Sequence, residues 1–141
     1  MSNAFNKFNS FAAAMPNKIH NLSSDVIKVA LCAAANAPVA TNTQLSNLTE
    51  IAYTNLSART VTVSSSTQSS GTYKFICADL VLTSSVGDVA GFRYAVLYND
   101  TATNKELIGY YDYGADIVLH GANGDTMTLD FDNVNGIFTL V

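Results

Sequence analysis

The chain has 141 residues, of which 48% are hydrophobic and 13% charged, and its formal net charge is −4. That length predicts a single domain with one core. An acidic balance with seven basic residues argues against nucleic-acid binding, which needs a basic surface, and no apolar run is long enough to predict a membrane span.

Neutral polar residues replace much of the usual charge, because Ser, Thr and Asn together supply 41 residues. Such a surface suits a protein that lies against other proteins better than one that attracts charged ligands. Charge is also uneven along the chain: residues 1–75 carry a net +3 and residues 76–141 a net −7. We interpret this asymmetry as two faces of one fold. The opening residues lack the apolar run of a signal peptide, so none is expected.

The first residues differ from the rest, and we predict an N-terminal arm over 1–16 and a single β-sandwich domain over 17–141. In the arm, an aromatic residue recurs at every third position and is followed by three alanines and a methionine; these apolar residues are Phe5, Phe8, Phe11 and Met15.

This spacing favours a short helix with an apolar stripe, capped by Ser2 or Asn3 and ended before Pro16. A helix of about 12 residues is marginal alone in water, so it needs a surface to lie on. Two surfaces are open to it: the protein's own barrel or a neighbouring subunit.

From residue 25 the pattern becomes strand-like, and DVIKVALC predicts a mostly buried strand over 25–32. A long polar stretch follows around Pro38, with a turn of helix expected at Gln44–Leu48. Loops of this length in a compact domain are usually functional or belong to an interface. The Pro38–Ile51 loop is therefore a second candidate for partner docking, with its apolar residues Pro38, Leu45, Leu48 and Ile51.

The remaining chain alternates strands with turns. RTVTVS predicts a strand, SSSTQSSG a flexible turn, and TYKFICADLVLT a strand whose phase changes near Ala78–Asp79, as at a bulge or bend. GFRYAVLYND, LIGYYDYG, ADIVLH and TMTLDF predict four further strands. Asn135-Gly136 predicts a hairpin that folds GIFTLV back onto TMTLDFDN.

About eight strands at this spacing favour an all-β fold, an antiparallel jelly-roll-like sandwich or barrel. An immunoglobulin-like sandwich is the alternative, but it would place a buried Trp beside paired cysteines, and the chain has no Trp. Cys32 and Cys77 lie in apolar runs, which favours two reduced buried thiols over a disulfide.

No motif predicts catalysis, a cofactor or a metal site, and we expect a protein that is not an enzyme. His20 and His120 have no ligand or nucleophile at a suitable spacing. Asp130 and Asp132 share a face of a strand, as paired catalytic carboxylates would, but solvated aspartates beside a turn are common. The run DFDNVNG departs from the EF-hand pattern at its fifth position, Val134.

Several segments together carry a resemblance: NAFNKFNSF, HNLSSDVIKVAL, APVATNTQLSNLTEIA, SSSTQSSGTYK, FRYAVLYND, LIGYYDYG and LDFDNVNGIFTLV. They resemble a family of small tailed-bacteriophage virion structural proteins, the capsid decoration (cement) proteins. The resemblance implies a β jelly roll, made in the host cytoplasm, that binds the outside of the head as a dimer or trimer and bridges neighbouring subunits of the major capsid protein. The two cysteines and the alanines after Phe11 depart from that pattern.

In such a protein the arm residues Phe5, Phe8, Phe11 and Met15 would be the anchors, because aromatic side chains dominate interface energetics. The alternative is a tail-associated structural or carbohydrate-binding jelly-roll module. It would use a tyrosine cluster to stack on sugars, made of Tyr98, Tyr110, Tyr111 and Tyr113.

Overall fold

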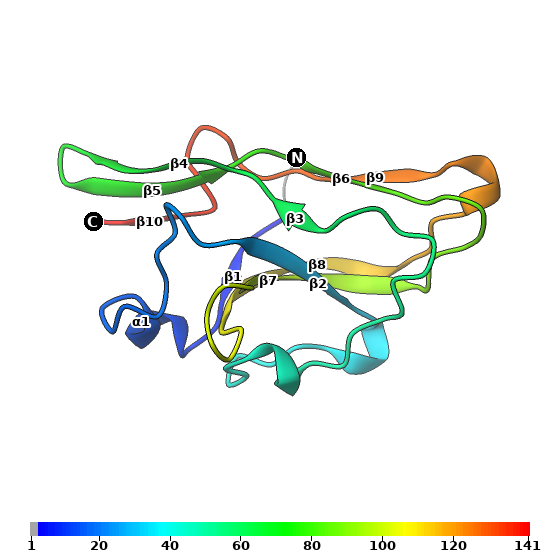
Figure 1. The fold of residues 1–141 in the computed structure, drawn as a ribbon, viewed down its shortest axis with the longest axis horizontal. Coiled ribbons are helices and arrows are strands. Elements are labelled where there is room, and N and C mark those ends of the chain that lie inside the picture. The colour runs from blue at the N-terminus through cyan, green and yellow to red at the C-terminus, as the bar shows by residue number, and fades with distance from the viewer. Residues whose placement is uncertain (1–2) are drawn as a thin grey trace.

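The hairpin of β7 (Phe92–Asn99) and β8 (Leu107–Ile117) forms the centre of the structure, a computed structural model that describes residues 3–141. β2 (Ile27–Cys32) pairs with the other side of β7. Two short strands, β1 (Asn6–Lys7) and β3 (Thr60–Val61), complete an antiparallel five-stranded sheet in the order β1-β8-β7-β2-β3. This sheet is the lower layer in Figure 1.

The predicted strands at 25–32 and in GFRYAVLYND are confirmed as β2 and β7. Both are apolar at nearly every position because both faces of this sheet are covered. The prediction of separate strands in LIGYYDYG and ADIVLH is wrong, since β8 runs through both. An irregularity in the pairing with β7, beside Gly114 at φ +86°, lets the strand continue.

The upper layer has a three-stranded sheet in the order β10-β5-β4 and a two-stranded sheet of β6 and β9 (Figure 1). Its strands are β4 (Val63–Ser69), β5 (Thr72–Cys77), β6 (Leu80–Thr83), β9 (Thr126–Leu129) and β10 (Phe138–Leu140). The all-β antiparallel sandwich is therefore confirmed. The described residues form ten strands rather than about eight, and their sheets stay open instead of closing into a barrel.

The SSSTQSSG segment is mostly strand rather than flexible turn, because β4 extends to Ser69 and pairs with β5. The turn is confined to Ser70 and Gly71, both at positive φ (50° and 81°), as a tight two-residue hairpin requires. Serine and threonine suit this strand because all of its residues are half-buried or exposed.

The predicted change of phase at Ala78–Asp79 is confirmed, since β5 ends and β6 begins on either side of these residues. The Asp79 carboxylate accepts a hydrogen bond from the Phe131 amide (3.0 Å), which ties the break to the C-terminal segment. The Asn135-Gly136 hairpin is wrong. β9 pairs with β6 and β10 with β5, so the chain bulges at 130–137 and continues in the same direction.

The arm also differs from the prediction. Its helix α1 spans only Phe11–Ala14, with Ser10 at the N-cap, while the preceding residues are extended and pair with β8. Asn3 caps no helix; its side-chain amide donates to the Asp112 carbonyl oxygen (2.6 Å). Ser2, the other expected cap, lies outside the described residues.

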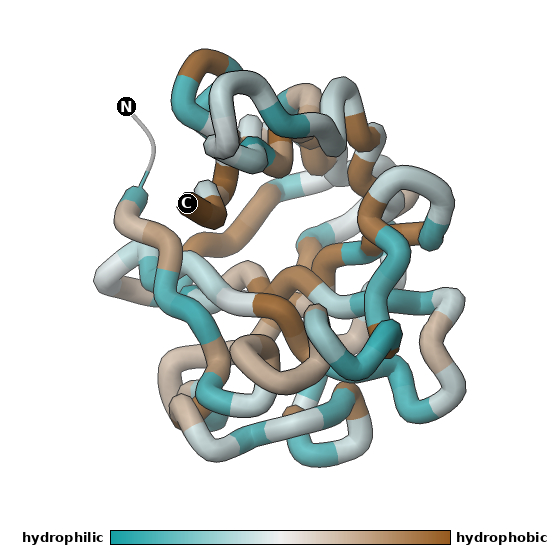
Figure 2. Tube along the Cα trace, turned by 90° about the vertical axis from the view of Figure 1, so that its left-hand side faces the viewer, coloured by the Kyte–Doolittle hydropathy of each residue, from teal (hydrophilic) through white to brown (hydrophobic). Residues whose placement is uncertain are grey.

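Apolar side chains fill one region on each face of the five-stranded sheet. The main core lies between the two layers and includes Phe11, Ile27, Leu31, Phe75, Phe92, Tyr111 and Phe131. The outer core lies on the opposite face and consists of Phe8, Ala30, Cys32, Tyr94, Val96, Tyr98 and Leu107. In Figure 2, hydrophobic residues run through the middle of the molecule and polar ones lie mostly at its rim.

The long polar stretch after β2 covers part of the outer core. It contains two 3-10 helices, Ala34–Asn36 and Leu45–Asn47, and the second confirms the turn of helix expected at Gln44–Leu48. Leu45 and Leu48 pack against the outer core from this side. No helix within residues 3–141 is long and apolar enough to cross a membrane.

Candidate docking site

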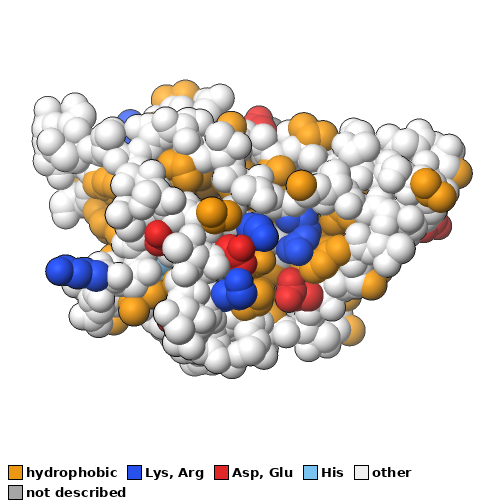
Figure 3. Space-filling model, viewed as in Figure 1, with side chains coloured by type: hydrophobic (Ala, Val, Ile, Leu, Met, Phe, Trp, Pro, Cys, Tyr) orange, Lys and Arg blue, Asp and Glu red, His pale blue; other side chains and the backbone are white. Residues whose placement is uncertain are grey.

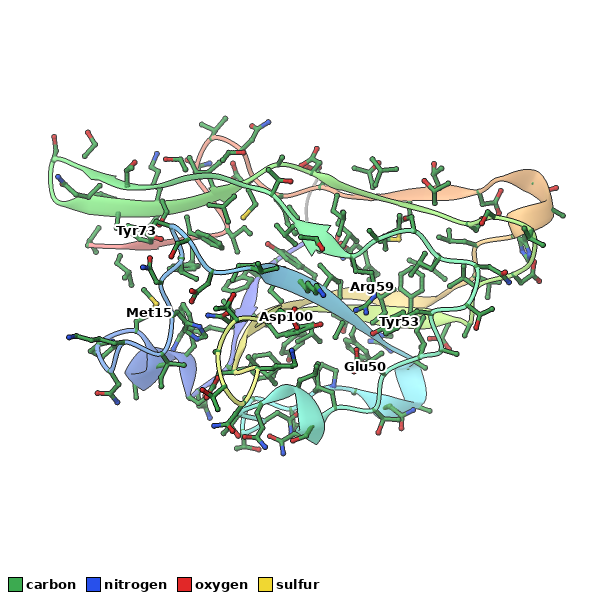
Figure 4. The ribbon with its side chains drawn as sticks, viewed as in Figure 1. Met15, Glu50, Tyr53, Arg59, Tyr73 and Asp100 are labelled. Carbon is green, nitrogen blue, oxygen red and sulfur yellow. The ribbon has the colours of Figure 1, made fainter. Side chains whose placement is uncertain are left out.

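An apolar groove opens between the arm and β10, with a volume of about 440 Å³. We call it the arm groove. Its apolar lining comes from the arm residues Phe5, Phe11 and Met15 and from the β10 residues Phe138 and Leu140. Figure 2 looks onto this end of the molecule and shows the hydrophobic C-terminal residues beside the arm, and Figure 4 marks Met15 at its edge.

The walls of the arm groove are held by strand pairing and by contacts between rings. β1 pairs with β8, and Gly109 makes this possible because a Cβ there would lie 2.7 Å from the Asn6 carbonyl oxygen. The Phe138 ring stacks with Phe5 at 6.2 Å and meets the edge of Phe11 at 5.1 Å. The two walls therefore hold each other in place.

The arm groove is bordered by two strand edges, since β1 ends the five-stranded sheet and β10 ends the three-stranded one. Edge strands carry backbone groups that another chain can pair with. An apolar hollow between two such edges is suited to hold an apolar segment of a protein.

A second surface lies on another side of the molecule, where the loop around the Leu45–Asn47 helix covers the outer core (Figure 1). We call it the loop surface. It is a shallow hollow of about 420 Å³ lined by Leu45, Leu48 and polar residues of the loop and of 103–105. The Gln44 and Asn47 side chains cap the short helix reciprocally, which holds its leucines in place.

The structure divides the predicted docking residues into two groups. Phe8, Phe11 and Pro38 are buried, and the two phenylalanines belong to the outer and main cores. The two phenylalanines of the arm therefore pack on the protein's own sandwich, which was one of the two surfaces considered for the arm; the other was a neighbouring subunit. Five others are only half-buried: Phe5, Met15, Leu45, Leu48 and Ile51.

The structure brings Phe5 and Met15 together in the arm groove and Leu45 and Leu48 together on the loop surface, while Ile51 packs against the main core. Sequence reasoning missed Phe138 and Leu140, which complete the groove. The alternation in FTL was visible, but only the pairing of β10 with β5 brings these residues beside the arm.

A charged cluster fastens the loop to β2. The Arg59 guanidinium lies 3.5 Å above the centre of the Tyr53 ring. The Tyr53 hydroxyl donates to the Glu50 carboxylate and accepts from the Leu31 amide (3.0 Å). Burial, followed by the hydrogen bond to Glu50, raises the pKa of Tyr53.

Figure 4 shows Glu50, Tyr53 and Arg59 close together with Asp100 on the same face, and Figure 3 shows acidic and basic side chains gathered in the middle of this face. Asp100 pairs with Lys28 and Lys105. Each of these charges has a partner of opposite charge, so the cluster stabilises the loop.

The two histidines and Asp132 make separate contacts in the structure. His20 is buried, its Nδ1 lies 3.0 Å from the Asn99 amide nitrogen, and burial lowers its pKa. His120 pairs with Asp88 at 3.1 Å in a different part of the molecule. The Asp132 carboxylate accepts from backbone amides of its own turn. Within residues 3–141, no three His, Cys, Asp or Glu side chains gather to hold a metal ion.

Cys32 and Cys77 are buried free thiols, as predicted, and the alternative of a disulfide is wrong. Burial raises the pKa of Cys32 to about 11 and that of Cys77 to about 12. The predicted tyrosine cluster does not form one stacking surface. Tyr98 and Tyr110 pack on the outer core, whereas Tyr111 and Tyr113 pack on the main core.

Comparisons with protein families, with curated proteins and with solved structures found no match for this chain. The features that indicate a function are therefore the arm groove, the loop surface and the chemistry of their residues.

Proposed function

We propose that the chain is a non-enzymatic decoration (cement) protein of a tailed-bacteriophage head, which binds the outside of the head and bridges neighbouring subunits of the major capsid protein. One observation carries the proposal: two surfaces with half-buried apolar residues, the arm groove and the loop surface, lie on different sides of one small sandwich. A protein that bridges others needs adhesive surfaces on more than one side. The resemblance of the sequence to decoration proteins is the reason for proposing a phage head as the particle that the protein binds.

The chemistry of both surfaces suits adhesion. Burying one leucine or phenylalanine side chain contributes about 1.5–3 kcal/mol, so each surface supplies a weak contact. Identical weak contacts repeated over a lattice add up through avidity. Since only 13% of the residues are charged, such contacts form without removing water from many ions.

The proposal includes two finer points that come from the resemblance. The open sandwich is a variant of the jelly roll, and the protein acts as a dimer or trimer on the head. The outward position on a head assembled in the host cytoplasm belongs to the same proposal.

Sedimentation with purified heads of the phage that encodes the chain tests the function. Wild-type protein is expected to pellet with heads, and the double variant Leu45→Asp/Leu48→Asp to stay in the supernatant, because two carboxylates would be desolvated at the contact. Val134→Asp is the matched control, since this side chain is 68% exposed and lies on neither surface. Wild-type protein that never pellets with heads would overturn the proposal.

Deleting the arm is the less informative experiment. Phe8 and Phe11 are buried in the two cores, so a truncated chain would lose its fold together with any docking surface. Leu45 and Leu48 are half-buried and pack against the outer core from outside, so variants there disturb the fold less than deletion of the arm would.

A second candidate, a carbohydrate-binding module, is favoured by one hollow of about 530 Å³ between residues 15–23 and the upper layer. Its lining joins the Tyr73 ring with neutral polar side chains, those of Asn21, Ser23 and Ser66. Figure 4 shows Tyr73 on this side of β5. Calorimetric titration with a panel of bacterial surface glycans tests it, and saturable binding lost in Tyr73→Ala would support it over the head-binding role.

A further inference from the structure

The connection between β6 and β7 contains a strained and exposed valine. Val86 has φ +71°, in the left-handed region, which is unusual for a β-branched residue. The Gly87 amide donates to the Ser85 carbonyl oxygen (2.8 Å), so Val86 is the centre of a three-residue turn of the rare γ type. Its side chain is 91% exposed. We call residues 84–89 the valine tip.

The valine tip is held firmly by the residues around it. The Ser85 amide donates to the Asn55 carbonyl oxygen (3.0 Å), and the Gly121 amide donates to that of Gly87 (3.1 Å). The Asn55 side chain donates to the Asp88 carbonyl oxygen (3.2 Å).

At the two ends of the tip, Ser84 and Val89 are buried. The fold therefore holds the apolar Val86 side chain in solvent in a strained backbone conformation, although this side chain adds nothing to the protein's own core. Strain that the surrounding structure maintains in this way is typical of a binding element.

The arm groove lies at the opposite end of the molecule. In Figure 1 the groove elements α1 and β10 are at the left end of the long axis, and the connection from β6 to β7 is at the right end. The groove is apolar and large enough for a valine and its turn, with a volume of about 440 Å³.

The two ends also carry opposite charge. Asp88 lies in the valine tip with a side chain 62% exposed and pairs with His120 at 3.1 Å, and Asp125 lies beside the tip, where its carbonyl oxygen accepts from the Ser84 amide. Asp116 lies just beyond the tip, beside Gly91. Exposed lysines lie at the other end, Lys7 in the groove lining and Lys18 just beyond Met15. Figure 3 shows a basic side chain at the left-hand end and an acidic side chain at the right-hand edge.

We propose that copies of this chain associate head to tail, with the valine tip of one copy seated in the arm groove of the next. The apolar side chain fills the groove, and the acidic residues around the tip face the lysines beside the groove. This inference rests on the proposed function, because it names the occupant of the groove and leaves the loop surface for the capsid. A head-to-tail contact joins two different surfaces, so copies form a ring where the rotation closes and a chain where it does not.

Mixing two variants tests the head-to-tail geometry. In sedimentation velocity, wild-type protein is expected to show a sedimentation coefficient that rises with concentration. Val86→Asp removes the tip, and Leu140→Asp places a charge at a 47% exposed position of the groove, so each variant alone is expected to remain monomeric. Each keeps the surface that the other lacks, and an equimolar mixture is therefore expected to form a dimer with one copy of each. Val134→Asp is the control and associates as wild type.

Three results would overturn the inference: a wild-type protein that stays monomeric, a mixture of folded Val86→Asp and Leu140→Asp that forms no dimer, or a Val86→Gly variant that associates like wild type. Val86→Gly relieves the backbone strain and removes the side chain, so loss of association in this variant cannot come from unfolding. Wild-type protein that fails this test but pellets with heads leaves the proposed function standing. Protein that passes it but never pellets with heads refutes the function alone.

Discussion

Replacing Phe8 by alanine tests most sharply whether the arm belongs to the protein's own core. Phe8 is fully buried in the outer core, and its ring lies 5.3 Å from that of Tyr110. Its amide donates to the Ile108 carbonyl oxygen (3.2 Å), which continues the pairing of the arm with β8. The substitution therefore leaves a cavity beneath a segment that the strand pairing holds in place.

The cost follows from this burial. Removing a fully buried phenylalanine side chain destabilises a protein by about 3–5 kcal/mol, through lost transfer energy and the cavity left behind. A domain of this size has a free energy of unfolding of about 5–15 kcal/mol. Since each kcal/mol lowers the midpoint by about 2–4 °C at this length, the expected decrease in melting temperature is about 6–20 °C.

Thermal and guanidinium unfolding, followed by circular dichroism, measure the effect. Met15→Ala is the matched control, because Met15 is half-buried at the lip of the arm groove and is expected to cost about 1 kcal/mol or less. If Phe8→Ala unfolds within about 2 °C of wild type, corresponding to less than 1 kcal/mol, the reasoning is refuted. Phe8 would then be available to a partner.

Three further predictions follow from the same contacts. Cys32 and Cys77 are expected to resist alkylation at pH 8 until the protein unfolds, because burial raises the pKa of both thiols. Mass spectrometry after iodoacetamide treatment measures the extent of alkylation. Rapid labelling of the native protein would contradict the burial of the two thiols. The hydrogen bond from Lys105 lowers the pKa of Asp100 below its ordinary 3.8, so the stability that this pair contributes is present above that pH and is lost as the pH falls below it. The free energy of unfolding of wild type in urea is therefore expected to exceed that of Asp100→Asn by less at acid pH than at neutral pH. A difference that grows as the pH falls would contradict the lowered pKa of Asp100. Val86→Gly is expected to raise the free energy of unfolding by about 1 kcal/mol, because glycine adopts positive φ without strain; a lower melting temperature would contradict the strained turn.

The sequence predicts well those strands whose two faces are both apolar, and those in which apolar and polar residues alternate strictly. β2 and β7 are apolar at nearly every position because the main core and the outer core cover both sides of their sheet. The break at Ala78–Asp79 was visible because the alternation changed phase there. In these places local pattern and tertiary burial agree.

Local pattern fails where a distant segment decides the structure. The Asn135-Gly136 turn was expected to make a hairpin, but β5 and β6 offer paired edges to the whole C-terminal segment, and the turn becomes a bulge between β9 and β10. The Ser-rich stretch looked like a turn because its residues are small and polar. Pairing with β5 makes it a strand.

The candidate site shows the same division. The sequence pointed to the arm and to the loop after β2, and both contribute half-exposed apolar residues to a surface. It could not separate Phe8, which faces the outer core, from Phe5 and Met15, which line the groove. That separation depends on how β1 pairs with β8, and no spacing along the chain reveals it.

The function that we propose is adhesion to a phage particle. Quantitative mass spectrometry of purified particles, with the major capsid protein as internal standard, measures it most directly. A copy number per particle comparable with that of the major capsid protein is expected. A protein absent from finished particles, or recovered only free in the infected-cell lysate, would contradict it.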